Sequence, residues 1–159
     1  MSVGRPSFLA ELTYRIKNRY PFIAVQYHGH SGPGFSPASM LEVARAGADY
    51  LDVAVEPLSW GKVHPDIITV REMLKADGFM VRDLDLNSYM EVRSLTQKYI
   101  DDFLGYWIDS NNSQMSSLLV GCGLPGGMMG SMMADLKNFH VAINAALKAQ
   151  GKKDLTLDR

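Results

Sequence analysis

Two histidines separated by one glycine end the first apolar segment of the chain, which reads FIAVQYHGHSGPG from Phe22 to Gly34. Successive side chains of an extended strand alternate between its two faces, so His28 and His30 should point to the same side. Two imidazoles on one face at the end of a strand could ligate a metal ion together. The alternative is a His-x-His that stands at a strand end by chance.

A second extended segment, residues 48–56, alternates in the same way. One of its faces is aliphatic, and the other carries the two carboxylates Asp52 and Glu56. Either carboxylate could be hydrogen-bonded to an imidazole and orient it. Either could equally be a polar group at a strand end, and the sequence leaves both readings open.

Four further features carry weaker signals. His64 lies in a loop and is interpreted as a solvated or loop-pinning residue rather than a third ligand. His140, on a predicted helix, is interpreted as a packed or surface histidine. Cys122 stands in an apolar run between two glycines, which favours buried packing over a nucleophilic role. The Gly126-Gly127 pair could cradle an anion, but no lysine-serine follows it, so it is interpreted as a structural turn.

The elements around the histidines form a strand–helix–strand pattern, which predicts a parallel pair of strands. Ser36, followed by a proline, is the expected N-cap of the helix, and Gly47 has the position of its C′ glycine. Both strands have an apolar face for helices and a polar face, which suits a (β/α)8 barrel better than an open doubly wound sheet. Chemistry in such barrels lies at the C-terminal strand ends, where His28, His30 and Glu56 lie.

Helical periodicity predicts four more helices along the chain. The third of the five predicted helices should be capped by Asp66. The predicted ranges, besides the helix that starts at Ser36, are 7–20, 66–76, 87–107 and 131–150.

Composition describes one ordinary folded unit of 159 residues, with 47% hydrophobic and 21% charged residues. Sixteen basic and seventeen acidic residues give a net charge of -1, which argues against nucleic acid or an anionic membrane as a partner. The single cysteine excludes an internal disulfide and favours a reducing compartment. Because no apolar run is long enough for a membrane span and no signal peptide precedes the first helix, we expect a soluble, cytoplasmic protein.

Three motifs follow one another in a particular order: His28-Gly29-His30, then Ala46-Gly47-Ala48-Asp49 ahead of the second strand, then Leu124-Pro125-Gly126-Gly127-Met128. Together they resemble the carboxyltransferase component of biotin-dependent enzymes. That family includes pyruvate carboxylase, the alpha subunit of oxaloacetate decarboxylase and the large subunit of transcarboxylase.

The resemblance implies an α/β fold: the C-terminal part of a (β/α)8 TIM barrel, followed by a mainly helical carboxylase domain. Residues 1–78 would contain the last two barrel strands with their helices, and residues 79–159 the start of the helical conserved carboxylase domain. It implies further that His28 and His30 hold a divalent metal such as zinc, manganese or cobalt. At that metal, CO2 would move between the biotin ureido nitrogen and the methyl carbon of a keto acid such as pyruvate or oxaloacetate.

The partners implied by the resemblance are a biotin carboxyl carrier domain, the remaining part of the carboxyltransferase, the keto acid, and further copies of the chain in a homo-oligomer. The family's other metal ligands, an aspartate and a carboxylated lysine, have no counterpart here, and Thr156 does not match its catalytic threonine. We therefore expect a fragment or a split piece of the enzyme, inactive alone. With only two histidines as ligands, it should bind metal poorly.

Two stretches depart from the family pattern and leave the acceptor substrate open. Residues 31–34 replace a usual Asp-Thr or Ser-Thr, and residues 61–65 (GKVHP) replace a usual Gly-x-Ser-Gln-Pro. A different class of function also stays open, in which the chain is a non-catalytic module for subunit association or carrier docking. A metal-dependent hydrolase is a third candidate, against which the Ala-Gly-Ala-Asp and Pro-Gly-Gly matches argue.

Overall fold

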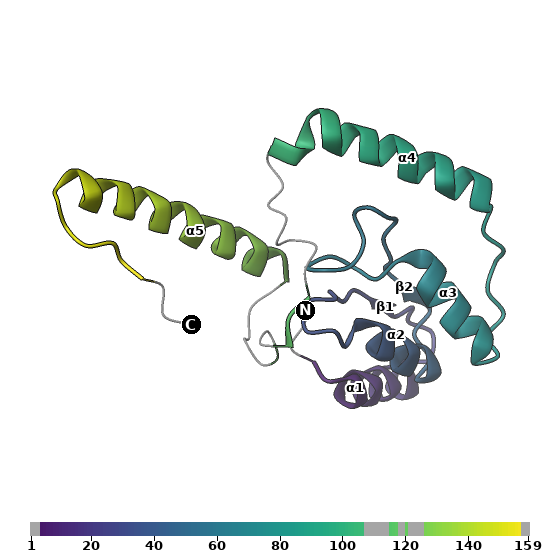
Figure 1. The fold of residues 1–159 in the computed structure, drawn as a ribbon. Helices are drawn as coiled ribbons and strands as arrows, with labels where there is room; N and C mark the ends of the chain where they lie inside the picture. Colours follow the sequence, from purple (N-terminus) through teal and green to yellow (C-terminus); the bar gives the residue numbers. More distant parts are fainter. Residues whose placement is uncertain (1–3, 107–114, 118–119, 121–125, 157–159) are drawn as a thin grey trace.

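The structure, a computed structural model, describes residues 4–106, 115–117, 120 and 126–156 (Figure 1). Helices α1 to α3 group around two short strands, and the long helices α4 and α5 run apart from each other (Figure 1). Among the described residues, the elements in chain order are α1 (Pro6–Arg19), β1 (Gln26–Tyr27), α2 (Ser36–Arg45), β2 (Tyr50–Leu51), α3 (Ile67–Ala76), α4 (Leu86–Asp102), the 3-10 helix η1 (Leu104–Tyr106) and α5 (Gly126–Ala149).

The two strands pair in parallel, as the strand–helix–strand pattern predicts. Gln26 lies opposite Tyr50, and Tyr27 lies opposite Leu51. Because α2 connects the parallel strands, the three elements form a βαβ unit. The ladder is shorter than the two predicted strands, which alternate over seven to nine residues each in the sequence. Among the described residues, each of the two strands pairs only with the other, so the sheet has no third strand there.

The Ala-Gly-Ala-Asp motif ends α2 and fixes the second strand against the first. Gly47 has a φ of +101°, the left-handed conformation predicted for a C′ glycine. The carboxylate of Asp49 accepts a hydrogen bond from the backbone N–H of Val25 at 2.7 Å, and another from the ammonium of Lys17 at 2.9 Å. These hydrogen bonds lower the pKa of Asp49. The motif therefore has a structural role, joining α1, β1 and the start of β2.

One predicted cap is wrong by one residue. Phe35 is the N-cap of α2, and Ser36 is already helical. The Ser36 hydroxyl donates to the carbonyl oxygen of Gly29 at 3.4 Å instead of accepting from its own helix. This contact ties the start of α2 to the segment between the two histidines.

The apolar faces of the strands pack on the helices, as their alternation predicts. Met40 of α2 with Val70 and Leu74 of α3 form the buried centre, and Tyr27 and Leu51 pack against it. The core therefore lies on the helix side of the βαβ unit. The histidines are expected on the opposite, polar side of the strands.

The later helices differ in their limits from the prediction. Helix α4 ends at Asp102, and η1 follows it, whereas α5 begins at Gly126, five residues before the predicted start. The residues Trp107, Cys122, Leu124 and Pro125, and with them the buried-packing interpretation of Cys122, lie outside the described residues. Among the helices that are described, none is long and apolar enough to cross a membrane.

A buried hydrogen-bond junction joins α4 to the βαβ unit. The Tyr89 hydroxyl donates to Oδ2 of Asp66 at 2.7 Å, and only 6% of Tyr89 and 4% of Asp66 are exposed. Asp66 is also the predicted N-cap of α3, since its Oδ1 accepts from the backbone N–H of Ile68 at 2.8 Å. Its Oδ2 accepts in addition from the N–H of Glu56 at 3.0 Å.

This junction should make the protein less stable in alkali. Burial, with the hydrogen bond to Asp66, raises the pKa of Tyr89 to about 12 from the ordinary value of 10.0. The folded protein therefore holds this proton more tightly than the unfolded chain, so the contribution is complete below pH 10 and is lost as the pH rises towards 12. Tyr89→Phe should remove this dependence, measured as the difference in urea-unfolding free energy between variant and wild type across pH 8–12. A difference that does not change with pH would contradict the assignment.

Candidate metal centre

The two predicted histidines directly follow β1 at its carboxyl end. His28 comes after Tyr27, the last strand residue, and His30 follows two residues after His28. Their ring centroids lie 5.2 Å apart. A Cβ on Gly29 would lie 2.2 Å from the Tyr27 hydroxyl oxygen, so a larger residue here would require the Tyr27 side chain to shift. The strand therefore presents both imidazoles side by side at its end.

A third imidazole comes from the loop after β2. The loop reverses direction at Trp60. The backbone N–H of Trp60 donates to the carbonyl of His64 at 2.7 Å, and the carbonyl of Trp60 accepts from the N–H of Val63 at 2.8 Å. Trp60 has a φ of +69° and Gly61 a φ of +51°. A bulky residue rarely adopts this conformation, and such strain persists only where surrounding contacts hold it. The reversal brings His64 back towards the end of β1.

Three hydrogen bonds join the two histidine-bearing loops. The backbone N–H of Ser31 donates to the carbonyl of Val63 at 2.7 Å. His30 Nδ1 lies 2.6 Å from the carbonyl oxygen of Lys62, and His64 Nδ1 lies 2.8 Å from that of Gly29. Each loop thus holds a histidine of the other, so the positions of the rings depend on both loops together.

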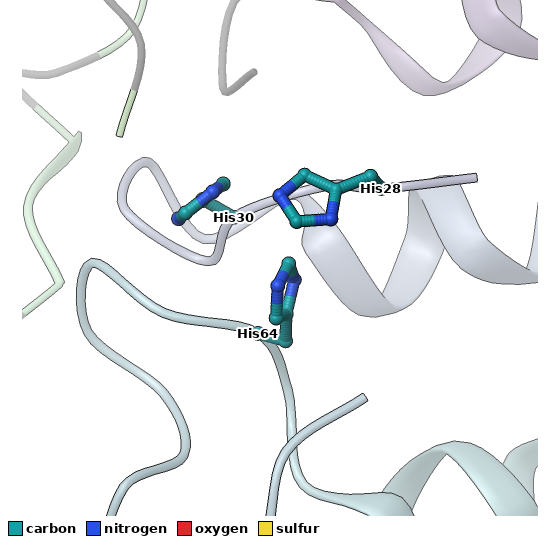
Figure 2. Close-up of side chains that lie close together, drawn as sticks. All are labelled: His28, His30 and His64. Carbon is teal, nitrogen blue, oxygen red and sulfur yellow. The ribbon is translucent and has the colours of Figure 1, made fainter. Parts of the chain in front are cut away.

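Figure 2 shows the resulting cluster, with His64 reaching from its own segment towards His28 and His30. The centroid of the His64 ring lies 4.4 Å from that of His28 and 4.8 Å from that of His30. One nitrogen from each of the three residues lies within 4.8 Å of the others. His28 is exposed, and the other two are half-buried. The interpretation of His64 as a loop-pinning residue is confirmed by its bond to Gly29, but it is not a solvated bystander.

Of the two carboxylates on the second strand segment, Asp52 contacts the histidines. Its Oδ2 lies 2.7 Å from Nδ1 of His28, and its Oδ1 accepts from the Gln26 amide at 2.6 Å. These two hydrogen bonds, the one with His28 first, lower the pKa of Asp52 and keep it an anionic acceptor. Glu56 pairs instead with the guanidinium of Arg93 at 3.0 Å. Of the two carboxylates, Asp52 is therefore the one that is hydrogen-bonded to an imidazole, and Glu56 is not.

The partners of the rings fix their protonation pattern. Carbonyl and carboxylate oxygens only accept hydrogen bonds, so Nδ1 must carry the proton in all three imidazoles. A neutral ring then keeps its lone pair on Nε2, the nitrogen that does not carry the proton. Burial, with smaller effects from the two neighbouring histidines, lowers the pKa of His30, which favours this neutral form.

This donor set fits a divalent transition metal. Histidine ligands in metal sites commonly donate their other ring N–H to a carboxylate or a backbone carbonyl, and all three rings make such a bond here. Imidazole nitrogens suit zinc and its first-row neighbours. The remaining histidine, His140, lies away from this cluster on α5, with Nε2 at 2.8 Å from the carbonyl oxygen of Leu155.

The fold and the site first indicate a class of protein. A parallel βαβ unit with polar ligands at the carboxyl ends of its strands is the arrangement of active sites in (β/α)8 barrels. The carboxyl transferase domain of Rhizobium etli pyruvate carboxylase, in a variant solved with pyruvate, superposes with a TM-score of 0.71 at 18% identity. The match covers 87% of this chain and 23% of that domain. At this identity the likeness shows the fold alone: the chain is a partial α/β unit that superposes on part of a TIM-barrel-type domain.

Sequence comparison adds particular relatives. The chain is 27% identical over 118 residues to a pyruvate carboxylase subunit of Methanothermobacter thermautotrophicus, covering 72% of this chain and 20% of the relative. It is 24% identical over 113 residues to the methylmalonyl-CoA carboxyltransferase 5S subunit of Propionibacterium freudenreichii, covering 71% and 22%. No family model matches. The chain thus spans about a fifth of these relatives. The homologues confirm the resemblance to carboxyltransferases of the biotin-dependent family.

Proposed function

We propose that the chain is part of a biotin-dependent carboxyltransferase that moves CO2 between carboxybiotin and a keto acid of the pyruvate or oxaloacetate type, at a metal held by His28 and His30. The observation that carries the proposal is the pair of imidazoles at the carboxyl end of β1, each oriented through Nδ1. The carboxyltransferase homologues supply the reaction class.

Residues 1–78 are proposed as two strands and the neighbouring helices of the barrel, and residues 79–159 as the start of the helical carboxylase domain. Apolar side chains around the strands support this division, because further strands would cover them. Phe22 is fully exposed, and 52% of Ile23 and 62% of Tyr50 are exposed.

The residues of this chain would hold and orient the reaction site. Asp52 and Gln26 keep the His28 ring in place, and the Lys62 carbonyl keeps the His30 ring in place. A divalent cation bound there would supply a Lewis acid for the keto acid oxygen on which charge develops. The biotin carboxyl carrier domain and the rest of the carboxyltransferase are the proposed partners. They would bring the carboxyl group and complete the site.

A second candidate function is supported by the long helices. Helix α4 exposes an apolar face on which 56% of Leu95 and 61% of Tyr99 are accessible. Helix α5 does the same with Leu136 at 54% and Phe139 at 67%. Exposed apolar faces of this extent mark association surfaces. The chain would then serve in homo-oligomer formation or carrier docking without turnover of its own.

Avidin sensitivity separates the two candidates. The tagged chain would be isolated from its own host with its bound polypeptides, and pyruvate release from oxaloacetate would be measured with and without avidin, which sequesters biotin. We expect avidin-sensitive turnover in the assembly, none above background in the chain alone, and loss of turnover in the His28→Ala/His30→Ala variant. Turnover that avidin does not inhibit would contradict carboxyl transfer. Association without turnover would favour the second candidate.

A further inference from the structure

We infer that His64 is a third metal ligand, so that this chain binds one first-row divalent cation through the imidazoles of His28, His30 and His64. The inference rests on the metal site of the proposed function, but not on its reaction. It also removes the ground for expecting weak metal binding, since that expectation counted two histidines only.

The distances place His64 as close to the pair as its two members are to each other. Its ring centroid is 4.4 Å from His28 and 4.8 Å from His30, against 5.2 Å between those two. Tetrahedral zinc with bonds of about 2.0–2.1 Å would set ligand nitrogens about 3.3 Å apart. One ring nitrogen of each residue, Nδ1 or Nε2, already lies within 4.8 Å of those of the other two. Modest side-chain rotations would therefore close the set around one ion.

The hydrogen-bond pattern of His64 matches that of the other two rings. Its Nδ1 donates to the carbonyl of Gly29, the residue between His28 and His30. Nε2 is therefore the nitrogen of His64 that can bind a metal, as in the two predicted ligands. In all three residues Nδ1 lies against an oxygen acceptor, which assigns Nε2 as the nitrogen that can bind a metal.

The loop that carries His64 is built to hold it. The far end of the loop is fixed because the Ala54 N–H donates to the Pro65 carbonyl at 3.0 Å. The turn at its near end keeps Trp60 in a strained conformation, with a φ of +69°. Strain of this kind occurs preferentially at functional sites. Three imidazoles would also leave a zinc ion one open position, as catalytic zinc sites do.

The competing explanation is that His64 only pins the two loops together through Gly29. His64→Asn separates the two roles, because an asparagine amide can still donate to the Gly29 carbonyl from about the position of Nδ1 but offers no Nε2. His140→Asn is the matched control, since His140 bonds a backbone carbonyl outside the cluster.

Zinc titration calorimetry on the full chain tests the inference. Wild type and His140→Asn should bind one equivalent with equal affinity. His64→Asn should bind at least about 100-fold more weakly, because loss of a direct ligand should cost more than the roughly 10–100-fold that loss of a ligand's hydrogen-bond partner costs. Wild-type zinc affinity in His64→Asn would show that His64 only holds the two loops together. Absence of zinc binding to wild type would overturn the inference altogether.

A measurement on wild type guards against a variant that fails to fold. In long-range ¹H–¹⁵N spectra, one equivalent of zinc should shift the Nε2 signals of His28, His30 and His64 and leave those of His140 unchanged. An unshifted His64 would overturn the inference. Zinc binding by all three residues without avidin-sensitive turnover in the assembly would refute the proposed reaction but not this site.

Discussion

Replacing Asp52 with alanine is expected to weaken zinc binding by about 10–100-fold, although Asp52 itself is not a proposed ligand. Its carboxylate holds Nδ1 of His28 at 2.7 Å, and the Gln26 amide holds the carboxylate in turn at 2.6 Å. Without it the exposed His28 ring loses the acceptor that selects its tautomer and orientation. Ring rotation and the wrong tautomer then both compete with metal binding.

Titration calorimetry of zinc would measure the Asp52→Ala effect, with Asp83→Ala as the control for loss of one negative charge. Asp83 pairs with Arg71 and Lys75, and its side chain is 92% exposed. The zinc affinity of Asp52→Asn should lie between those of wild type and Asp52→Ala, since an amide oxygen still accepts from His28 but carries no full negative charge. Equal zinc affinities for Asp52→Ala and Asp83→Ala would show that Asp52 does not orient the ligand.

Asp66→Ala should produce the largest loss of stability, about 2–4 kcal/mol. Loss of the N-cap of α3 accounts for about 1 kcal/mol. The variant also removes the acceptor of the buried Tyr89 hydroxyl and one acceptor of the Glu56 N–H. The loss of these hydrogen bonds adds about 1–3 kcal/mol. Asp66→Asn keeps an acceptor oxygen for the cap and should lose less.

Urea unfolding at pH 7, followed by circular dichroism, measures both Asp66 variants against wild type. Because Asp66 follows directly after the loop that carries His64, the alanine variant should also weaken zinc binding. A change of less than about 0.5 kcal/mol in Asp66→Ala, the range of an ordinary surface substitution, would contradict the role assigned to this junction.

The features that local sequence rules govern were predictable. Gly47 ends α2 in the left-handed conformation, Asp66 caps α3, and the two strands pair in parallel. His28 and His30 lie together, as strand alternation predicts, although both residues follow the end of β1. The cap at Ser36 was predicted one residue away from its place, because a tertiary contact with Gly29 competes for the serine hydroxyl.

The position of His64 could not be read from periodicity, because the residue lies in an irregular loop. Its place depends on the reversal at Trp60 and Gly61 and on hydrogen bonds to a loop more than thirty residues earlier. One signal was available nevertheless. Loops that follow adjacent parallel strands leave the same edge of the sheet, so a histidine after β2 could have been expected near the pair after β1.

The metal content of the purified chain tests the central claim most directly. Elemental analysis of protein prepared without chelators would be compared with that of the His28→Ala/His30→Ala variant, with circular dichroism to show that the variant keeps its helices. We expect about one divalent transition metal per wild-type chain and almost none in the variant. An equal metal content in both proteins, or none in wild type even after incubation with zinc, would contradict a metal site at these histidines.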